Sequence, residues 1–76
     1  MPKAPVISAQ EAIRAFQRAG FLEDRQSGSH CILKKAGHPV HLSIPVHKGK
    51  KLGQGLLKAQ IEAAGLTIDE FKALLK

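Results

Sequence analysis

Aromatic residues are scarce in this sequence of 76 residues, which contains no Trp, no Tyr and only three Phe. Any core must therefore be mostly aliphatic. A chain of this length has room for one domain. It buries only about 60% of its unfolded surface, so we expect a modest stability. The hydrophobic fraction of 43% is nevertheless too high for a disordered chain.

Cysteine occurs once, at Cys31, so the chain cannot form an intrachain disulfide. A lone thiol suits a reducing compartment. No apolar run reaches the ~20 residues needed to cross a bilayer. The first residues, Met1-Pro2-Lys3-Ala4-Pro5, also lack the apolar segment of a signal peptide. We therefore expect a cytoplasmic protein.

Acidic residues are few. The chain has 6 Asp and Glu and 12 Lys and Arg, so its net charge is +6 with His neutral. A surplus of this size in a small domain favours an anionic partner. Nucleic acid is the first candidate, and an acidic protein or an anionic membrane surface are alternatives. A basic protein without such a partner is the remaining interpretation.

Helix patterns occur before and after the centre of the chain. Residues 1–7 contain two prolines and form an arm. A helix is predicted over residues 8–19, because Ser8 and Glu11 have the spacing of a capping box. A second helix is predicted over residues 53–64, and a third begins at a further capping box that starts with Thr67.

The central residues are predicted to form three strands joined by tight turns. These strands cover residues 21–26, 30–35 and 40–44. Apolar and polar residues alternate in the last two strands, so each has one buried and one outward side. The expected inward residues of the third strand are Val40, Leu42 and Ile44. If this strand pairs with the second, His30, Lys34, His41 and Ser43 share the outward face.

This order of elements, α-β-β-β-α-α, predicts an α+β fold with a three-stranded antiparallel sheet. The helices can cover one face of the sheet and leave the other to solvent or to a partner. The chain is divided into a flexible N-terminal arm, residues 1–7, and a single domain, residues 8–76.

The sequence lacks the residues that several kinds of functional site need. The chain has four histidines: His30, His38, His41 and His47. Their spacing matches no familiar zinc site, so we expect neither a metal nor another cofactor. Cys31 faces away from His30 in a strand, which favours a core residue over a nucleophile. The glycine-rich segment 48–55 lacks a Walker pattern. Its lysines either face solvent or bind a phosphodiester backbone.

The stretch Ser27-Gly28-Ser29-His30 lies between two predicted strands, where Gly and Ser favour a tight turn. A histidine without any role is the simplest interpretation. Beside lysines, however, an imidazole can transfer protons while the ammonium groups neutralise charge at phosphorus. Metal-free RNA cleavage through the ribose 2′-hydroxyl needs these groups. The sequence leaves open the chemical partner of His30, for which the candidates are His41, His47, Lys34 and Ser29.

Five segments carry a resemblance to a known family: Ala19-Gly20-Phe21, Gly28-Ser29-His30, Ile44-Pro45-Val46-His47, Gly55-Leu56-Leu57-Lys58 and Ala63-Ala64-Gly65-Leu66. With these segments the chain resembles, over about residues 8–75, the HicA toxins, which are the mRNA interferases of type II HicA–HicB toxin–antitoxin pairs. The family often has Gly-Thr-Leu at the position of Gly55-Leu56-Leu57, so this chain lacks a threonine hydroxyl there.

The resemblance implies a fold similar to double-stranded-RNA-binding domains and ribosome-independent cleavage of mRNA, with His30 as the catalytic residue. It also implies a HicB-type antitoxin that covers the active site. The sequence therefore predicts a metal-independent endoribonuclease toxin with no membrane partner. A non-catalytic RNA-binding module and an interaction protein for an acidic partner are the alternatives.

The predicted site extends beyond His30. His41 is a candidate for catalytic support. The predicted RNA-binding residues are Gly28, Ser29, Lys34, His47, Lys48, Lys50, Lys51 and Lys58.

Overall fold

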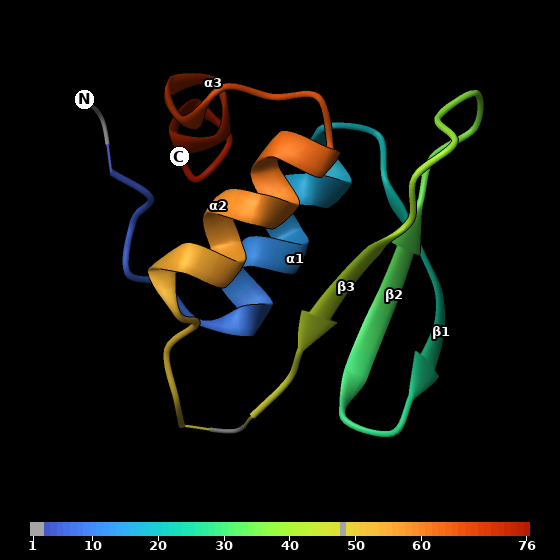
Figure 1. Cartoon of the computed structure of the whole chain (residues 1–76), viewed down its shortest axis with the longest axis horizontal. Coiled ribbons are helices and arrows are strands. Elements are labelled where there is room, and N and C mark those ends of the chain that lie inside the picture. Colours follow the sequence, from blue (N-terminus) through green and yellow to red (C-terminus); the bar gives the residue numbers. More distant parts are fainter. Residues whose placement is uncertain (1–2, 48) are drawn as a thin grey trace.

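The computed structural model describes residues 3–47 and 49–76. Its helices are α1 (Ala9–Arg18), α2 (Gln54–Ala63) and α3 (Ile68–Ala73), and its strands are β1 (Leu22–Ser27), β2 (His30–Lys34) and β3 (Leu42–Pro45) (Figure 1). The predicted α+β fold and the order of its elements are confirmed. None of the helices in the described residues is long and apolar enough to span a bilayer.

Capping residues set the helix boundaries that the sequence predicts. The Ser8 hydroxyl accepts a hydrogen bond from the Glu11 N–H at 3.2 Å, and the Glu11 carboxylate accepts one from the Ser8 N–H at 3.1 Å. Thr67 and Glu70 repeat this reciprocal capping box at α3. Gly65 follows α2 with a φ of 80°, the left-handed conformation that commonly ends a helix.

The three strands form an antiparallel sheet in the order β1-β2-β3. His30 lies opposite Ser27 of β1 and Pro45 of β3. The register of β1 shifts between Glu23 and Arg25, where an extra residue forms a bulge. The ladder places His30 at the end of the sheet that holds the β1–β2 turn.

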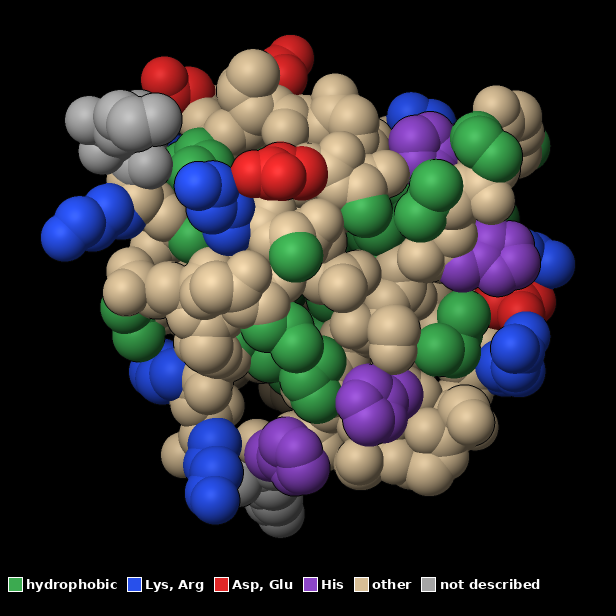
Figure 2. Space-filling model, viewed as in Figure 1, with side chains coloured by type: hydrophobic (Ala, Val, Ile, Leu, Met, Phe, Trp, Pro, Cys, Tyr) green, Lys and Arg blue, Asp and Glu red, His purple; other side chains and the backbone are tan. Residues whose placement is uncertain are grey.

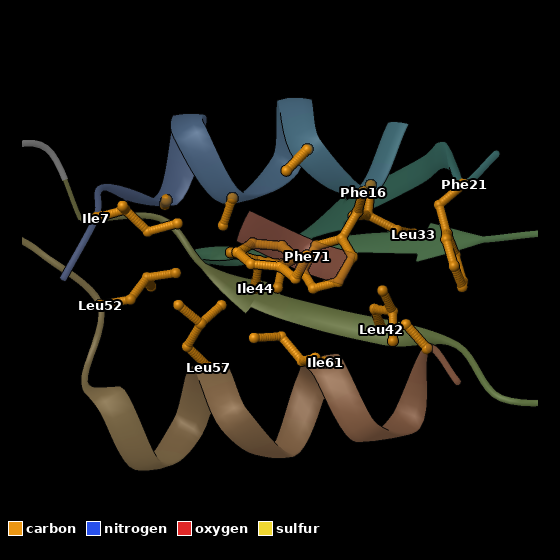
Figure 3. Close-up of a cluster of buried hydrophobic side chains, with 14 of the residues drawn as sticks. Ile7, Phe16, Phe21, Leu33, Leu42, Ile44, Leu52, Leu57, Ile61 and Phe71 are labelled. Carbon is orange, nitrogen blue, oxygen red and sulfur yellow. The ribbon is translucent and has the colours of Figure 1, made fainter. Parts of the chain in front are cut away.

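One face of the sheet is buried beneath α1 and α2 (Figure 1). The strand residues that point toward the helices are Cys31, Leu33, Leu42 and Ile44. Figure 3 shows the largest core side chains meeting between the two helices and the sheet. Phe16 and Phe71 contact each other there with ring centroids 4.9 Å apart, so α3 closes one side of the core.

The third strand is shorter than predicted, and the placement of Val40 was wrong. Val40 is 44% exposed and lies in the β2–β3 connection, because β3 begins only at Leu42. His38 of the same connection lies with its Nε2 2.7 Å from the carbonyl oxygen of Ala63 at the end of α2. This contact draws the connection toward α2, so the strand ladder stops before Val40.

The N-terminal segment lies against the domain. Ala4 and Ile7 are buried in the core. The Gln54 side chain donates a hydrogen bond to the Ala4 carbonyl oxygen at 2.6 Å, and the Leu52 N–H donates one to the Ile7 carbonyl oxygen at 2.8 Å. These bonds attach the predicted arm to the chain that leads into α2.

Candidate active site and nucleic-acid interface

His30 lies on the face of the sheet that the helices leave open. It is the first residue of β2 and follows a turn in which Gly28 has a φ of 60°. Glycine adopts this conformation without strain. Side chains alternate along β2, so Cys31 and Leu33 are buried while His30 and Lys34 are exposed. The imidazole therefore faces solvent on a backbone that two neighbouring strands support.

The backbone beside His30 is joined to the segment after β3. Pro45 lies opposite His30, and the next N–H, of Val46, donates a 2.6 Å hydrogen bond to the Ser29 carbonyl oxygen. This bond brings the β1–β2 turn next to the chain that leads to His47. Figure 2 shows histidine side chains (purple) with a basic side chain (blue) nearby at the lower edge of the view, at this end of the molecule.

A cleft of about 600 Å³ opens between the N-terminus of α1 and the segment that follows β3. Its lining residues are Ser8, Ala9, Gln10, Val46, His47, Gly49, Lys50 and Lys51. The two walls are joined by a single β-bridge between Ser8 and Lys51. A space of this size accommodates a nucleotide-sized ligand. Lys48, which the sequence also assigns to RNA binding, lies outside the described residues.

The helix wall of this cleft was missed in the sequence analysis. Ser8 was identified only as a cap, and Ala9 and Gln10 only as parts of a helix. Nothing local in the sequence indicates that they face residues 46–51. The contacts that bring the walls together, such as the bridge between Ser8 and Lys51, join residues far apart in the sequence.

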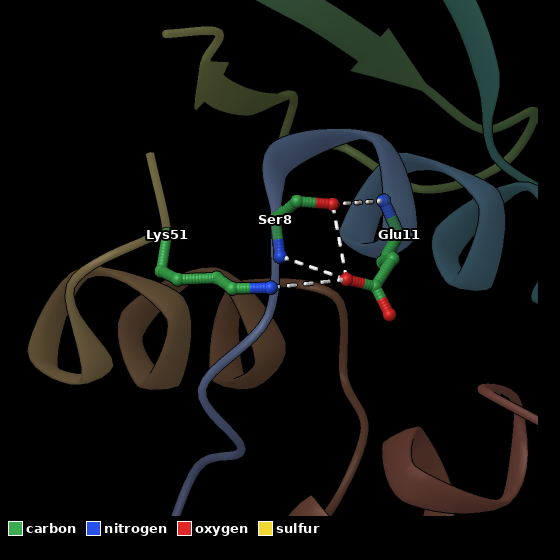
Figure 4. A network of polar contacts seen from close by, with 3 residues as sticks. All are labelled: Ser8, Glu11 and Lys51. Carbon is green, nitrogen blue, oxygen red and sulfur yellow. Dashed lines mark hydrogen bonds and ion pairs between the residues drawn. The ribbon is translucent and has the colours of Figure 1, made fainter. Parts of the chain in front are cut away.

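A carboxylate adjoins the basic wall of the cleft. Glu11 accepts hydrogen bonds from the N–H and the hydroxyl of Ser8, and its Oε1 lies 3.8 Å from Lys51 Nζ (Figure 4). The Ser8 hydrogen bonds, with a smaller contribution from the positive charge of Lys51, hold the pKa of Glu11 below its usual value. Glu11 is therefore charged at neutral pH and forms an exposed ion pair with Lys51 beside the cleft.

Two predicted RNA-binding lysines lie away from this cleft. Lys34 Nζ is 2.9 Å from Asp24 Oδ1, and Arg25 contacts the other oxygen of Asp24 at 2.7 Å. The Lys34 hydrogen bond is the main cause of the lowered pKa of Asp24. Lys34 is also four residues from His30, about 13 Å along a strand. Lys58 is exposed on α2.

His38 and His41 lie at the opposite end of the sheet from His30. His41 is exposed and precedes β3, four residues before Pro45 and thus about 13 Å along the strand from the partner of His30. His38 is bonded to Ala63. Within residues 3–47 and 49–76, no three His, Cys, Asp or Glu side chains are grouped as they would be to hold a metal ion.

Cys31 is a core residue, as the strand alternation predicts. It is 1% exposed, and its thiol donates a 3.0 Å hydrogen bond to Glu23 Oε1. Burial, together with this bond to a carboxylate, raises the pKa of the Cys31 thiol to about 12. A neutral thiol on the covered face of the sheet cannot act together with His30 on the open face.

The sequence matches a family model described as the HicA toxin of bacterial toxin–antitoxin systems over residues 9–66. The chain belongs to the HicA toxin family. This match includes His30 and most of the cleft, and it confirms the resemblance seen in the sequence. A HicA family chain is the toxin of a toxin–antitoxin system. A search of curated proteins found no match.

Proposed function

We propose that this HicA family toxin is a metal-independent endoribonuclease that cleaves mRNA, with His30 as a catalytic proton-transfer residue. The observation that carries the proposal is the exposed imidazole of His30 at the start of β2, after a turn that is hydrogen-bonded to Val46 of the basic cleft. An imidazole changes its protonation state near neutral pH, which suits it to proton transfer.

The reaction begins at the ribose that precedes the scissile phosphate. Its 2′-hydroxyl attacks the adjacent phosphorus, and a neutral His30 accepts the hydroxyl proton. Lysine ammonium groups stabilise the charge that develops on the phosphate oxygens. The products are a 2′,3′-cyclic phosphate and a 5′-hydroxyl end. DNA lacks the 2′-hydroxyl, so it is not a substrate for this route.

The cleft supplies a basic surface at the same end of the sheet as His30. Lys50 and Lys51 line it, and they are the strongest candidates for contacts with the RNA backbone. A Cβ atom at Gly28 would meet no other atom within 4 Å, so this side of the turn is open to solvent. The proposed RNA-binding residues are Gly28, Ser29, Lys34, His47, Lys48, Lys50, Lys51 and Lys58.

The lysines outside the cleft contact more distant parts of the RNA in this proposal. Lys34 lies on the open face beyond His30, and Lys58 lies on α2. His41 is at the far end of the sheet, so we leave it out of the group that acts on the phosphate at His30.

A HicB-type antitoxin is the partner that the family suggests. We place its binding surface over His30 and the cleft. A partner that covers these residues excludes RNA directly, and the net charge of +6 favours an acidic surface on the antitoxin.

Incubation of the purified chain with mRNA in excess chelator tests the activity. We expect fragments with cyclic phosphate ends from the unsubstituted protein and none from His30→Ala. A matched RNA with 2′-deoxyribose at the mapped cleavage site should stay intact. If RNA binds but is never cut, the protein is an RNA-binding module. If RNA does not bind even at low salt, an acidic protein partner is favoured instead.

A further inference from the structure

Cleavage by the proposed route needs two proton transfers, of which His30 performs one. The 2′-hydroxyl loses a proton, and the departing 5′-oxygen gains one. We propose that His47 is the second catalytic residue and, as an imidazolium, protonates the leaving 5′-oxygen. This assignment rests on the proposed ribonuclease function.

The structure separates the candidates for this second role. Lys34 is paired with Asp24 at 2.9 Å and lies about 13 Å along β2 from His30. His41 is at the opposite end of the sheet. Ser29 adjoins His30, but a neutral hydroxyl is a poor proton donor near neutral pH. His47 is the remaining candidate, and it follows two residues after Pro45, the strand partner of His30.

The backbone brings His47 to the end of the sheet that holds His30 in two steps. Pro45 lies opposite His30 in the ladder, which sets their Cα atoms about 5 Å apart. His47 follows two residues later, at most about 7 Å further along the chain. The hydrogen bond from the Val46 N–H to the Ser29 carbonyl oxygen fixes the segment between them.

The two imidazoles approach one phosphate from different walls. His30 belongs to the open face of the sheet, whereas His47 lines the cleft between α1 and the segment after β3. A phosphodiester at the junction of the two surfaces has His30 on the side of the attacking ribose. His47 is then on the side of the leaving nucleotide, which the cleft receives.

The charged groups around His47 come from both walls of the cleft. Lys50 and Lys51 line the same cleft, and α1 contributes Ser8 and, behind it, Glu11. The Glu11 carboxylate is engaged with Ser8 and Lys51. The two lysines are the candidates for contacts with phosphate, and His47 is the imidazole among the residues that line the cleft.

The step balances without any further reactant. The bond between the 2′-oxygen and phosphorus forms while the bond between phosphorus and the 5′-oxygen breaks. His30 takes the proton of the 2′-hydroxyl, and His47 gives its proton to the 5′-oxygen. After the step His30 is protonated and His47 is neutral. Proton exchange with water restores the starting state of each imidazole.

A substrate with a better leaving group tests the assignment directly. RNA with sulfur in place of the bridging 5′-oxygen leaves as a thiolate and does not need a general acid. His47→Ala should cut ordinary RNA about 100- to 1,000-fold more slowly and the sulfur-containing RNA at nearly the unsubstituted rate. His30→Ala should be slow on both substrates. His41→Ala, the matched histidine at the other end of the sheet, should be normal on both.

Three outcomes contradict the proposal in different ways. If His47→Ala is equally slow on both substrates, His47 is not the acid. If it weakens binding of a non-cleavable 2′-O-methyl RNA by the same factor as cleavage, His47 is only a phosphate ligand. If the unsubstituted protein cuts neither substrate, the proposed ribonuclease function itself fails, whatever His47 does.

Discussion

His30 and His38 are the same residue type in opposite settings. The His38 Nε2–H donates to the Ala63 carbonyl oxygen at 2.7 Å, and its ring meets Phe21 edge-on at 5.4 Å between centroids. His30 is exposed, and among the described residues its ring has no hydrogen-bond partner. One imidazole joins two parts of the fold, and the other is free to contact a ligand.

The difference comes from what lies next to each histidine. The end of a helix carries carbonyl groups without partners inside the helix, and His38 donates to one of these at the end of α2. His30 points to the face of the sheet that no helix covers. The comparison predicts that changes at one end of the sheet affect stability and changes at the other affect chemistry.

Replacement of His30 should have the largest effect. His30→Ala should lower kcat/KM for RNA cleavage by about 1,000-fold, because proton transfer by a positioned side chain is worth roughly 100- to 10,000-fold. The free energy of unfolding should change by less than about 0.5 kcal/mol, because an exposed side chain is lost. Kinetics and thermal melting on one preparation check both values. A large loss of stability would remove the contrast with His38.

Cys31 extends the comparison to a second titratable group inside the fold. Its pKa of about 12 leaves little thiolate at pH 8, so alkylation by iodoacetamide should be at least about 100-fold slower in the native than in the unfolded protein. Because folding raises the pKa of this thiol, the buried protonated thiol contributes fully to the free energy of unfolding below about pH 8.5, the usual thiol pKa. This contribution is lost as the pH rises toward 12. Mass spectrometry follows the alkylation. Equal rates in both states would show an exposed thiol.

Lysines of the cleft should contribute more to RNA binding than the same number of lysines elsewhere on the surface. The double change Lys50→Gln and Lys51→Gln should weaken RNA binding roughly tenfold at physiological salt. It should also reduce the slope of log K against log salt by about 1 to 1.5. Lys72→Gln with Lys76→Gln removes the same charge near the C-terminus and is the control. Equal losses in both double variants would mean that the cleft has no special role.

His38→Ala should destabilise the fold by about 1–2 kcal/mol, because the Ala63 carbonyl oxygen loses its donor. His38→Gln offers an amide N–H at a similar position and should recover part of this loss. Cleavage under conditions in which the protein is folded should be unchanged. Denaturant unfolding measures the first effect. A catalytic defect in folded His38→Ala would overturn the division between the two ends.

His41→Ala should have the smallest effect. The side chain is exposed and lies at the end of the sheet remote from His30, so stability should change by less than about 0.5 kcal/mol and cleavage should not change. The same kinetic and melting assays apply. A tenfold loss of cleavage would show that the RNA, or a movement of the β2–β3 connection, brings His41 to the site.

The elements of this fold could be predicted because their determinants are local. Ser8 with Glu11 and Thr67 with Glu70 mark helix starts within four residues, and alternation in β2 correctly separates Cys31 from its neighbours. Alternation in the third predicted strand was wrong for Val40, which it placed in the core. The apolar pattern includes Val40, but β3 begins only two residues later.

The surroundings of the site depend on contacts between distant residues, so they could not be predicted. Spacing does not reveal that Ser8 meets Lys51, that Ala4 is buried beside the chain leading into α2, or that Asp24 reaches Lys34. The bulge in β1 accompanies the last contact, because it shifts the register at Asp24. The exposed position of His30 could be predicted because its turn and its strand are adjacent in sequence.

The bridge between Ser8 and Lys51 also has a consequence for synthesis of the toxin. A nascent chain that ends before residue 51 has neither the second wall of the cleft nor Leu57 and Ile61, which the core takes from α2. The cleft is therefore incomplete until the chain has been synthesised beyond Lys51. A ligand that contacts both walls of the cleft therefore cannot bind in this way to a nascent chain that ends before Lys51.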